Sequence, residues 1–125
     1  MARNIIIVGA GIGGLTTALA FAAQGCEVDI VEQAPVLSEV GAGLQVSPNA
    51  SRILIALGLG QKLQDSTISP REIVLSSGRT LRKITLIPCG SYAQDRWGAP
   101  YGVMHRADLQ GLLVNAVNAH PNCNL

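Results

Sequence analysis

The feature that most limits what this chain can fold into is a glycine-rich turn placed directly after a short apolar run. Asn4–Val8 is rich in β-branched residues, which is typical of a parallel strand buried on both faces. It leads into the pattern Gly-x-Gly-x-x-Gly at Gly9, Gly11 and Gly14. In such a unit the first glycine allows a tight turn, the second lets a pyrophosphate approach the backbone, and the third lets the helix pack closely on the strand. The spacing predicts an α/β fold that opens with a βαβ unit.

The residues after the turn complete this unit. A stretch of small and apolar residues at helical spacing ends at Gly25, and Val28–Val31 follows as a second buried strand. Glu32 stands at the end of that strand, 21 positions after Gly11, which is close to the spacing at which a carboxylate reaches a ribose hydroxyl. A carboxylate there repels a 2′-phosphate, so the site disfavours NADP and leaves FAD and NAD. A βαβ unit without a nucleotide is the alternative.

Composition sets outer limits on partners and location. The 125 residues suit one domain or a little less, and 14% charged residues with a net charge of +1 argue against nucleic acid as the main partner. Three widely spaced cysteines (Cys26, Cys89, Cys123) indicate neither a disulfide framework nor a metal site. Glycines interrupt the apolar N-terminal run, and no run approaches the roughly 18 residues of a membrane span. We therefore expect a soluble cytoplasmic protein without a bound metal.

The middle of the chain carries two further signals. Gly41 and Gly43 flank one alanine, which indicates backbone that lies close to something flat or bulky. Ser47 and Pro48 are typical of an N-cap and the first residue of a helix, which would stop at Gly58. A surface loop followed by a well-capped helix remains the alternative for this stretch, and residues 61–67 predict another helical turn or two.

A hairpin and a loop are expected next. Residues 72–75 and 80–86 are typical of two antiparallel strands joined by a turn at 76–79. Residues 88–100 contain two prolines, two glycines and Trp97, and are expected to form a loop of a length that is often functional. Trp97 can serve either as a packing anchor or as a ligand platform, and packing is the favoured interpretation.

The last segment predicts a short strand at Tyr101–His105 and a helix that Arg106 opens. No carboxylate, serine or cysteine stands at a spacing from His105 that would indicate a catalytic pair, so His105 is interpreted as structural. Asp108 suits the helix dipole, whereas a cation such as Arg106 at a helix N-terminus is unfavourable unless an anion lies opposite. A diphosphate would be such an anion, and arginine offers it a bidentate fork. An exposed arginine making surface contacts is the alternative.

Three blocks together resemble a known family, the single-component FAD-dependent aromatic hydroxylases of the salicylate hydroxylase and 3-hydroxybenzoate 6-hydroxylase branch. The resemblance spans nearly the whole chain, and the second and third blocks are more specific than the first. The blocks are residues 7–32, residues 41–50, and residues 105–109 together with Leu112 and Leu113.

The resemblance implies an extended FAD, with Glu32 on the adenosine ribose, glycines along the diphosphate, and Arg106 at the diphosphate or ribityl region. It implies that Leu44 and Gln45 approach the isoalloxazine. NADH or NADPH would reduce the flavin as a transient hydride donor, and O2 would form a C4a-hydroperoxide that hydroxylates a phenolic or hydroxybenzoate-like ring. No catalytic residue is identified. The residues expected to hold the cofactor are Gly9, Gly11, Gly13, Gly14, Glu32, Gln33, Leu44, Gln45 and Arg106.

The departure from the family is length, because its members are roughly three times as long, while this chain holds one domain's worth of residues. The chain is therefore expected to be a truncated piece, inactive by itself. We expect residues 1–70 to form a Rossmann-like FAD-binding segment, 71–100 to begin an antiparallel substrate-domain sheet, and 101–125 to return to the FAD-binding domain, with a further strand of the nucleotide sheet at 122–125. Another flavoenzyme of this fold, such as an epoxidase, reductase or halogenase, and a non-catalytic nucleotide-binding module are the alternatives.

Overall fold

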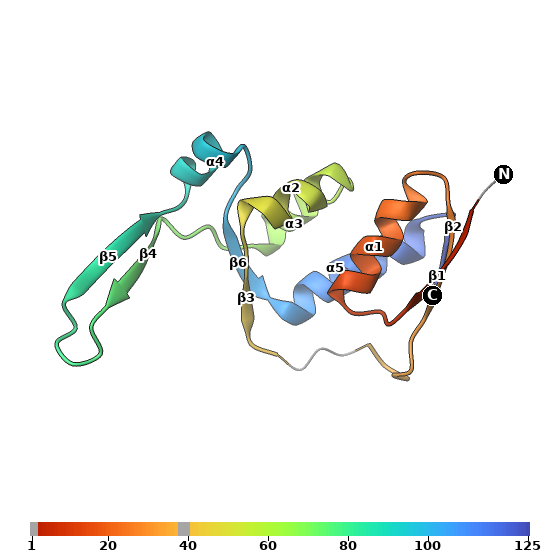
Figure 1. Ribbon diagram of the computed structural model, residues 1–125, viewed down its shortest axis with the longest axis horizontal. Coiled ribbons are helices and arrows are strands. Elements are labelled where there is room, and N and C mark those ends of the chain that lie inside the picture. The colour runs from red at the N-terminus through yellow and green to blue at the C-terminus, as the bar shows by residue number, and fades with distance from the viewer. Residues whose placement is uncertain (1–2, 38–40) are drawn as a thin grey trace.

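The computed structural model describes residues 3–37 and 41–125 of the chain. A parallel sheet lies at one end of the molecule and an antiparallel hairpin projects from the other (Figure 1). The helices are α1 (Ile12–Ala22), α2 (Pro48–Ala56), α3 (Gly60–Ser66), α4 (Ser91–Trp97) and α5 (Arg106–Ala119). The strands are β1 (Asn4–Val8), β2 (Glu27–Val31), β3 (Gly43–Val46), β4 (Glu72–Ser76), β5 (Lys83–Pro88), β6 (Gly102–His105) and β7 (Cys123–Asn124).

The parallel sheet has the order β1-β2-β7. β1 and β2 pair in register from Asn4 opposite Glu27 to Val8 opposite Val31, with α1 as the crossover. The predicted βαβ unit is therefore confirmed. β7 adds to the other edge of β2, with Val28 opposite Cys123. This is the further strand that the family resemblance implied for residues 122–125.

The main core lies on one face of this sheet, where α1 and α5 pack against it and against each other (Figure 1). Leu15 and Ala18 of α1 and Leu113 and Val117 of α5 are completely buried. The opposite face is open. Its apolar side chains Ile6 and Val8 are 72% and 84% exposed, so the expectation that β1 is buried on both faces is wrong for the described residues. The reason is that both helices that reach the sheet cover the same side.

A second, two-stranded ribbon joins distant parts of the chain. β3 pairs antiparallel with β6, from Gly43 opposite His105 to Val46 opposite Gly102. This pairing brings the start of α2 and the start of α5 to opposite ends of one short ribbon. The helix predicted after Ser47 is confirmed, since Ser47 is the N-cap of α2, Pro48 stands at its first position, and Gly58 takes a positive φ of 80° after it.

The hairpin of β4 and β5 is shorter on its second arm than predicted. β5 begins at Lys83 rather than at Thr80. Leu81 has a positive φ of 56°, and the Ser77 amide donates to the Arg82 carbonyl oxygen at 2.9 Å. Residues 77–82 therefore form the connecting turn, because a left-handed residue cannot continue a strand.

The expected loop over residues 88–100 is also corrected, because it contains helix α4. Ala93 is completely buried on this helix and anchors it beside Cys89 and Tyr101. Gly98 ends the helix in a left-handed conformation with φ of 69°. Trp97 is 43% exposed and packs edge-on against Tyr92, with ring centroids 5.7 Å apart, so its packing role is only partial.

Candidate functional site

The glycine turn between β1 and α1 has the geometry that its sequence predicts. Gly9 has a φ of 100°, and its amide donates to the Val31 carbonyl oxygen at 2.7 Å, which fixes the turn to the end of β2. A Cβ atom on Gly14 would collide with the Gly9 carbonyl oxygen. Helix and turn therefore approach as closely as only glycine allows.

The other two glycines of the turn leave their backbone open. A Cβ on Gly11 or Gly13 would meet no atom within 4 Å. Gly11 is the N-cap of α1, no side chain caps this helix, and its first turn holds no acidic residue. The first N–H groups of a helix have no intrahelical acceptor and carry the positive end of the helix dipole. This open, uncapped end is suited to a phosphate group.

Glu32 lies against the turn. Its Oε2 accepts a hydrogen bond from the Ala10 amide at 2.7 Å, and its Oε1 accepts one from the Ala34 amide at 2.8 Å. These two backbone hydrogen bonds, the one from Ala10 first, lower the pKa of the carboxyl group below its ordinary value. The carboxylate is thus ionised at neutral pH, and its remaining lone pairs can accept from hydroxyl groups.

Two depressions lie on either side of the glycine turn, a hollow beside Glu32 and a groove that begins at α1. The hollow is lined by Glu32, Ala34 and Pro35 among others, and Gln33, although adjacent in sequence, does not line it. The groove, of about 400 Å³, starts at Ile12 in the first turn of α1. We call it the α1 groove; its lining residues are Ile12, Thr16, Leu44, Gln45, Val46, Ala50, Ile53, Leu54, Arg106 and Leu109.

The α1 groove brings together three candidate residues that are far apart in sequence. Leu44 and Gln45 enter it from β3, and Arg106 enters it from the first turn of α5. Pairing of β3 with β6 is what places them side by side, since β6 leads directly into Arg106. Gly41 lies beside Arg106, since a Cβ at Gly41 would be in van der Waals contact with Cδ of Arg106, 3.4 Å away. The expectation that this backbone lies close to something flat or bulky stays a prediction.

One positioning residue was missed by the sequence analysis. Gln110 of α5 is buried, and its Nε2 donates to the Ala10 carbonyl oxygen at 3.2 Å. Ala10 is thus held on both sides, through its carbonyl by Gln110 and through its amide by Glu32. Its role could have been predicted from its position, because Gln110 is a polar residue between Leu109 and Leu112 on an otherwise apolar helix face.

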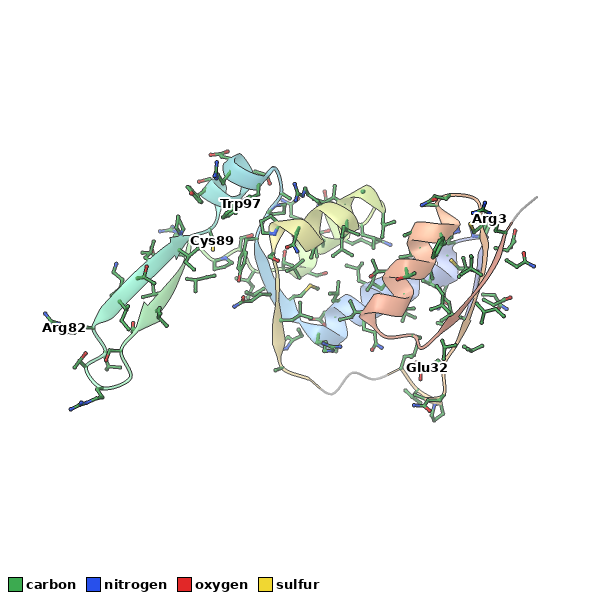
Figure 2. All side chains as sticks on the ribbon, viewed as in Figure 1. Arg3, Glu32, Arg82, Cys89 and Trp97 are labelled. Carbon is green, nitrogen blue, oxygen red and sulfur yellow. The ribbon has the colours of Figure 1, made fainter. Side chains whose placement is uncertain are left out.

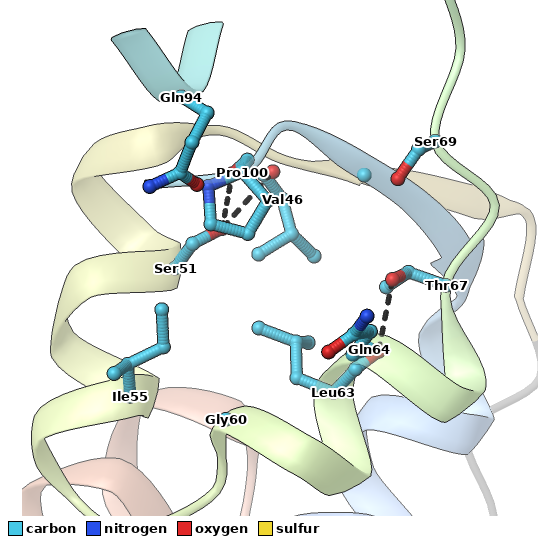
Figure 3. Close-up of a pocket in the computed structure, with 11 residues that line it drawn as sticks. Val46, Ser51, Ile55, Gly60, Leu63, Gln64, Thr67, Ser69, Gln94 and Pro100 are labelled. Atoms are coloured by element: carbon cyan, nitrogen blue, oxygen red, sulfur yellow. Dashed lines mark hydrogen bonds between the residues drawn. The ribbon is translucent and has the colours of Figure 1, made fainter. Parts of the chain in front are cut away.

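A more enclosed cavity of about 380 Å³ lies between α2, α3 and the start of β6 (Figure 3). Its hydroxyl groups are occupied internally: Ser51 Oγ donates to the Pro100 carbonyl oxygen at 2.7 Å, and Thr67 Oγ1 donates to the Leu63 carbonyl oxygen at 2.9 Å. None of the described residues that line it is charged. It therefore offers no charged side chain to a nucleotide, whereas Glu32 and Arg106 do so on the other side of the molecule's core.

Two further features bear on the kind of site. Within residues 3–37 and 41–125, no group of three or more His, Cys, Asp or Glu side chains is arranged to hold a metal ion. In the same part of the chain, no helix is both long and apolar enough to cross a membrane.

Known proteins that resemble this chain contain the same kind of nucleotide-binding unit. Residues 7–45 match the family model described as an NAD(P)-binding Rossmann-like domain. The chain is 42% identical over 116 residues to 3-hydroxybenzoate 6-hydroxylase 1 of Aquipseudomonas alcaligenes, covering 93% of this chain and 29% of that protein. These matches confirm the family resemblance carried by the three sequence blocks.

Solved structures show the same fold. A tetrameric form of 2-methyl-3-hydroxypyridine-5-carboxylic acid oxygenase superposes with a TM-score of 0.83 at 24% identity, over 99% of this chain and 31% of that one. Klebsiella pneumoniae HpxO, crystallised in complex with FAD and uric acid, gives 0.70 at 27% identity, over 90% of this chain and 28% of that one. The chain thus spans less than a third of the length of these proteins.

Proposed function

We propose that this chain, a relative of 3-hydroxybenzoate 6-hydroxylase, is the FAD-binding part of an NAD(P)H-dependent monooxygenase that hydroxylates a phenolic or hydroxybenzoate-like ring. The observation that carries the proposal is the open backbone at Gly11 and Gly13, with the Glu32 carboxylate on one side and the α1 groove on the other. A dinucleotide needs an anion site between a ribose acceptor and a largely apolar groove, and these residues fit that requirement.

Each part of the cofactor has candidate partners in this chain. Glu32 would accept hydrogen bonds from the adenosine ribose, with Gln33 flanking it, and the glycine turn would hold the diphosphate. Arg106 would bind the diphosphate or ribityl region through its guanidinium, which matches phosphate oxygens as a bidentate donor. Leu44 and Gln45 would lie beside the ring system. The residues of the turn are Gly9, Gly11, Gly13 and Gly14.

When bound, FAD supplies redox chemistry, accepting a hydride from NADH or NADPH and reacting with O2. The task of this chain's own residues is to bind and orient it. Gln110 and Glu32 hold Ala10 from both sides and so fix the turn that would bind the diphosphate. Ile12, Leu44 and Leu109 give the α1 groove an apolar lining, which would reduce the access of water to a bound ring.

The wider organisation follows from the same proposal. Residues 1–70 and 101–125 would form the cofactor-binding unit, and residues 71–100 would begin the sheet of a substrate domain. The partners would be a small aromatic substrate and O2, and the protein would be cytoplasmic. The proposal includes neither nucleic acid nor a membrane among the partners.

The test is FAD retention by the purified protein, followed by the visible absorbance of the flavin. Arg106→Ala is expected to weaken FAD retention about tenfold or more, the scale for loss of a charged hydrogen bond. Arg79→Ala, at the exposed hairpin turn, is the matched control and is expected to leave retention unchanged. A wild-type protein that takes up no FAD would contradict the whole proposal, and equal retention in both variants would contradict the role of Arg106.

A further inference from the structure

The enclosed cavity between α2, α3 and the start of β6 lies outside the set of residues proposed to hold FAD (Figure 3). We call it the α2–α3 cavity. Its volume of about 380 Å³ is near the lower end of the range for small-molecule sites, roughly 300–1,000 Å³. A volume of this size suits one small ring with a substituent, so the chemistry of the lining decides which kind of molecule fits.

Apolar side chains line the body of the α2–α3 cavity. Val46 of β3 and Leu63 of α3 are only 2% and 3% exposed, and Ile55 of α2 adds a third branched side chain. Val46 also lines the α1 groove, so this one residue separates the two sites. Because none of the described lining residues is charged, an ionic ligand would lose its hydration without gaining a partner. The lining therefore favours a neutral ligand with an apolar body.

The hydroxyl groups of Ser51 and Thr67 can only accept hydrogen bonds from a ligand. A hydroxyl group carries one proton and two lone pairs. Ser51 Oγ gives its proton to the Pro100 carbonyl oxygen at 2.7 Å, and Thr67 Oγ1 gives its proton to the Leu63 carbonyl oxygen at 2.9 Å. The ligand must therefore bring the donor. Thr67 is the more accessible acceptor, because it is half-buried whereas Ser51 is 1% exposed.

Gln64 provides a donor beside this acceptor. It stands in the last turn of α3, and Thr67 is the C-cap residue of the same helix. Residues three positions apart lie on the same side of a helix end, and Figure 3 shows Gln64 and Thr67 on the same side of the cavity. The amide of a glutamine donates through its nitrogen. One ligand hydroxyl is therefore matched on both counts, since it donates to Thr67 Oγ1 and accepts from Gln64.

We propose that the α2–α3 cavity is a binding site for a small neutral alcohol. Val46, Ile55 and Leu63 contact its apolar body. Its hydroxyl group donates to Thr67 Oγ1 and accepts from the Gln64 amide. A ketone of the same size accepts from Gln64 but has no proton for Thr67, and a carboxylate brings a charge that no lining side chain balances. This site goes beyond the proposed function, because it holds neither the cofactor nor a charged ligand.

The experiment titrates the full-length protein, labelled at its Ile, Leu and Val methyl groups, with cyclohexanol and with cyclohexanone, and follows the methyl resonances by NMR. The two probes share a ring and differ little in volume, but only the alcohol donates a hydrogen bond. We expect the methyl resonances of Val46, Ile55 and Leu63 to shift together with either probe. Cyclohexanol should bind about 2- to 10-fold more tightly than cyclohexanone, the scale of one neutral hydrogen bond.

Two variants test the two hydrogen bonds separately. Thr67→Val keeps the shape of the side chain and removes the acceptor, so it should weaken cyclohexanol binding about 2- to 10-fold and leave cyclohexanone within about twofold. Gln64→Leu removes the donor and should weaken both probes to a similar extent. Thr80→Val is the matched control and should bind both probes as the wild type does. Thr80 belongs to the turn over residues 77–82, and Figure 2 shows Arg82 of this turn at the tip of the hairpin.

The outcomes separate this inference from the proposed function. If neither probe shifts the methyl resonances of Val46, Ile55 and Leu63 in the wild type, the cavity is not a binding site and the inference is overturned. Equal affinity for alcohol and ketone, or equal weakening of both by Thr67→Val, overturns the choice of an alcohol. A protein that holds no FAD contradicts the proposed function alone, because the NMR titration does not depend on the cofactor. The methyl spectrum without ligand shows whether each variant has folded, and the exposed Gln64 keeps the test available if Thr67→Val is unstable.

Discussion

The glycine turn and the β4–β5 hairpin lie at opposite ends of the molecule and are specified in different ways (Figure 1). At the turn, backbone geometry decides: Gly9 has a positive φ, Gly14 has no room for a side chain, and Ala10 is hydrogen-bonded on both sides. At the hairpin, apolar side chains such as Ile84, 64% exposed, face outward, and only the base is anchored in a small core.

This difference predicts that substitutions at the turn lower stability more than substitutions in the outer hairpin. Constraints at the turn come from hard atomic contacts and buried hydrogen bonds, so a single atom can disturb them. Within these 125 residues, the outer hairpin is held mainly by its own strand pairing and has few buried contacts to lose. Four substitutions distinguish the two regions, and position 14 should be the most sensitive of them.

Gly14→Ala should be the most damaging change. The added methyl group collides with the Gly9 carbonyl oxygen, and backbone on both sides of the contact cannot move aside easily. We expect the free energy of unfolding to fall by about 3 kcal/mol, the upper end of the range for overpacking, in chemical denaturation experiments. Gly111→Ala on α5 is the control, because the added Cβ would meet nothing within 4 Å. The free energy of unfolding of this variant should rise by up to about 1 kcal/mol. Equal stabilities would refute a steric role for Gly14.

Gln110→Leu should follow. The substitution removes the donor to the Ala10 carbonyl oxygen and leaves that oxygen buried without this partner. The expected loss is about 1–3 kcal/mol in the free energy of unfolding, accompanied by weaker FAD retention. Gln61→Leu serves as the control, since Gln61 donates to Asp65 on the exposed face of α3, and should change stability by no more than about 0.5 kcal/mol. The hypothesis is wrong if the two variants behave alike.

Glu32→Gln should act through both the cofactor and pH. FAD retention is expected to fall about tenfold, because a charged acceptor becomes a neutral one. In the wild type the pKa of Glu32 is lowered by folding, so its contribution to stability is present above its ordinary pKa of 4.5 and is lost as pH falls through the lower native value. Circular dichroism across an acid titration should therefore show wild type and variant converging below pH 4.5. A stability difference that stays constant into strong acid would contradict this account.

Ile84→Thr should have the smallest effect. The side chain lies on the outer hairpin and is mostly exposed, so the free energy of unfolding should change by no more than about 0.5 kcal/mol. Ile73→Thr sharpens the comparison, because Ile73 packs against the cluster of Cys89, Ala93 and Tyr101 and should lose about 1 kcal/mol or more. Similar losses at the two positions would show that the outer hairpin is not the weakly constrained region described above.

The sequence predicted what local chemistry dictates. Glycine spacing, the N-cap at Ser47 and the helix that Arg106 opens all follow from rules that act over a few residues, and the structure has them where expected. Helix α4 was missed because seven residues give too few apolar positions to establish a period, and one buried alanine anchors it. The other indication of this helix in the sequence is the pair of glycines that flank it, Gly90 and Gly98.

Long-range pairing could not be read from one sequence. Gln110 and Ala10 are 100 positions apart, and only the docking of α5 beside α1 makes them partners. The sequence indicated that Gly41 needs a close neighbour and that Arg106 is unusual at a helix start, but their contact depends on the β3–β6 register. The open face of β1 was mispredicted for a similar reason, because residue types alone do not say on which side two helices will lie.

The hydrogen bonds of Glu32 have a consequence for how a nucleotide would bind. Both carboxylate oxygens accept hydrogen bonds from backbone amides of this chain, so the fold itself restricts the rotamers of the side chain. An arriving sugar would meet an acceptor that is pre-organised by folding itself, and the entropy of ordering this side chain would not count against affinity.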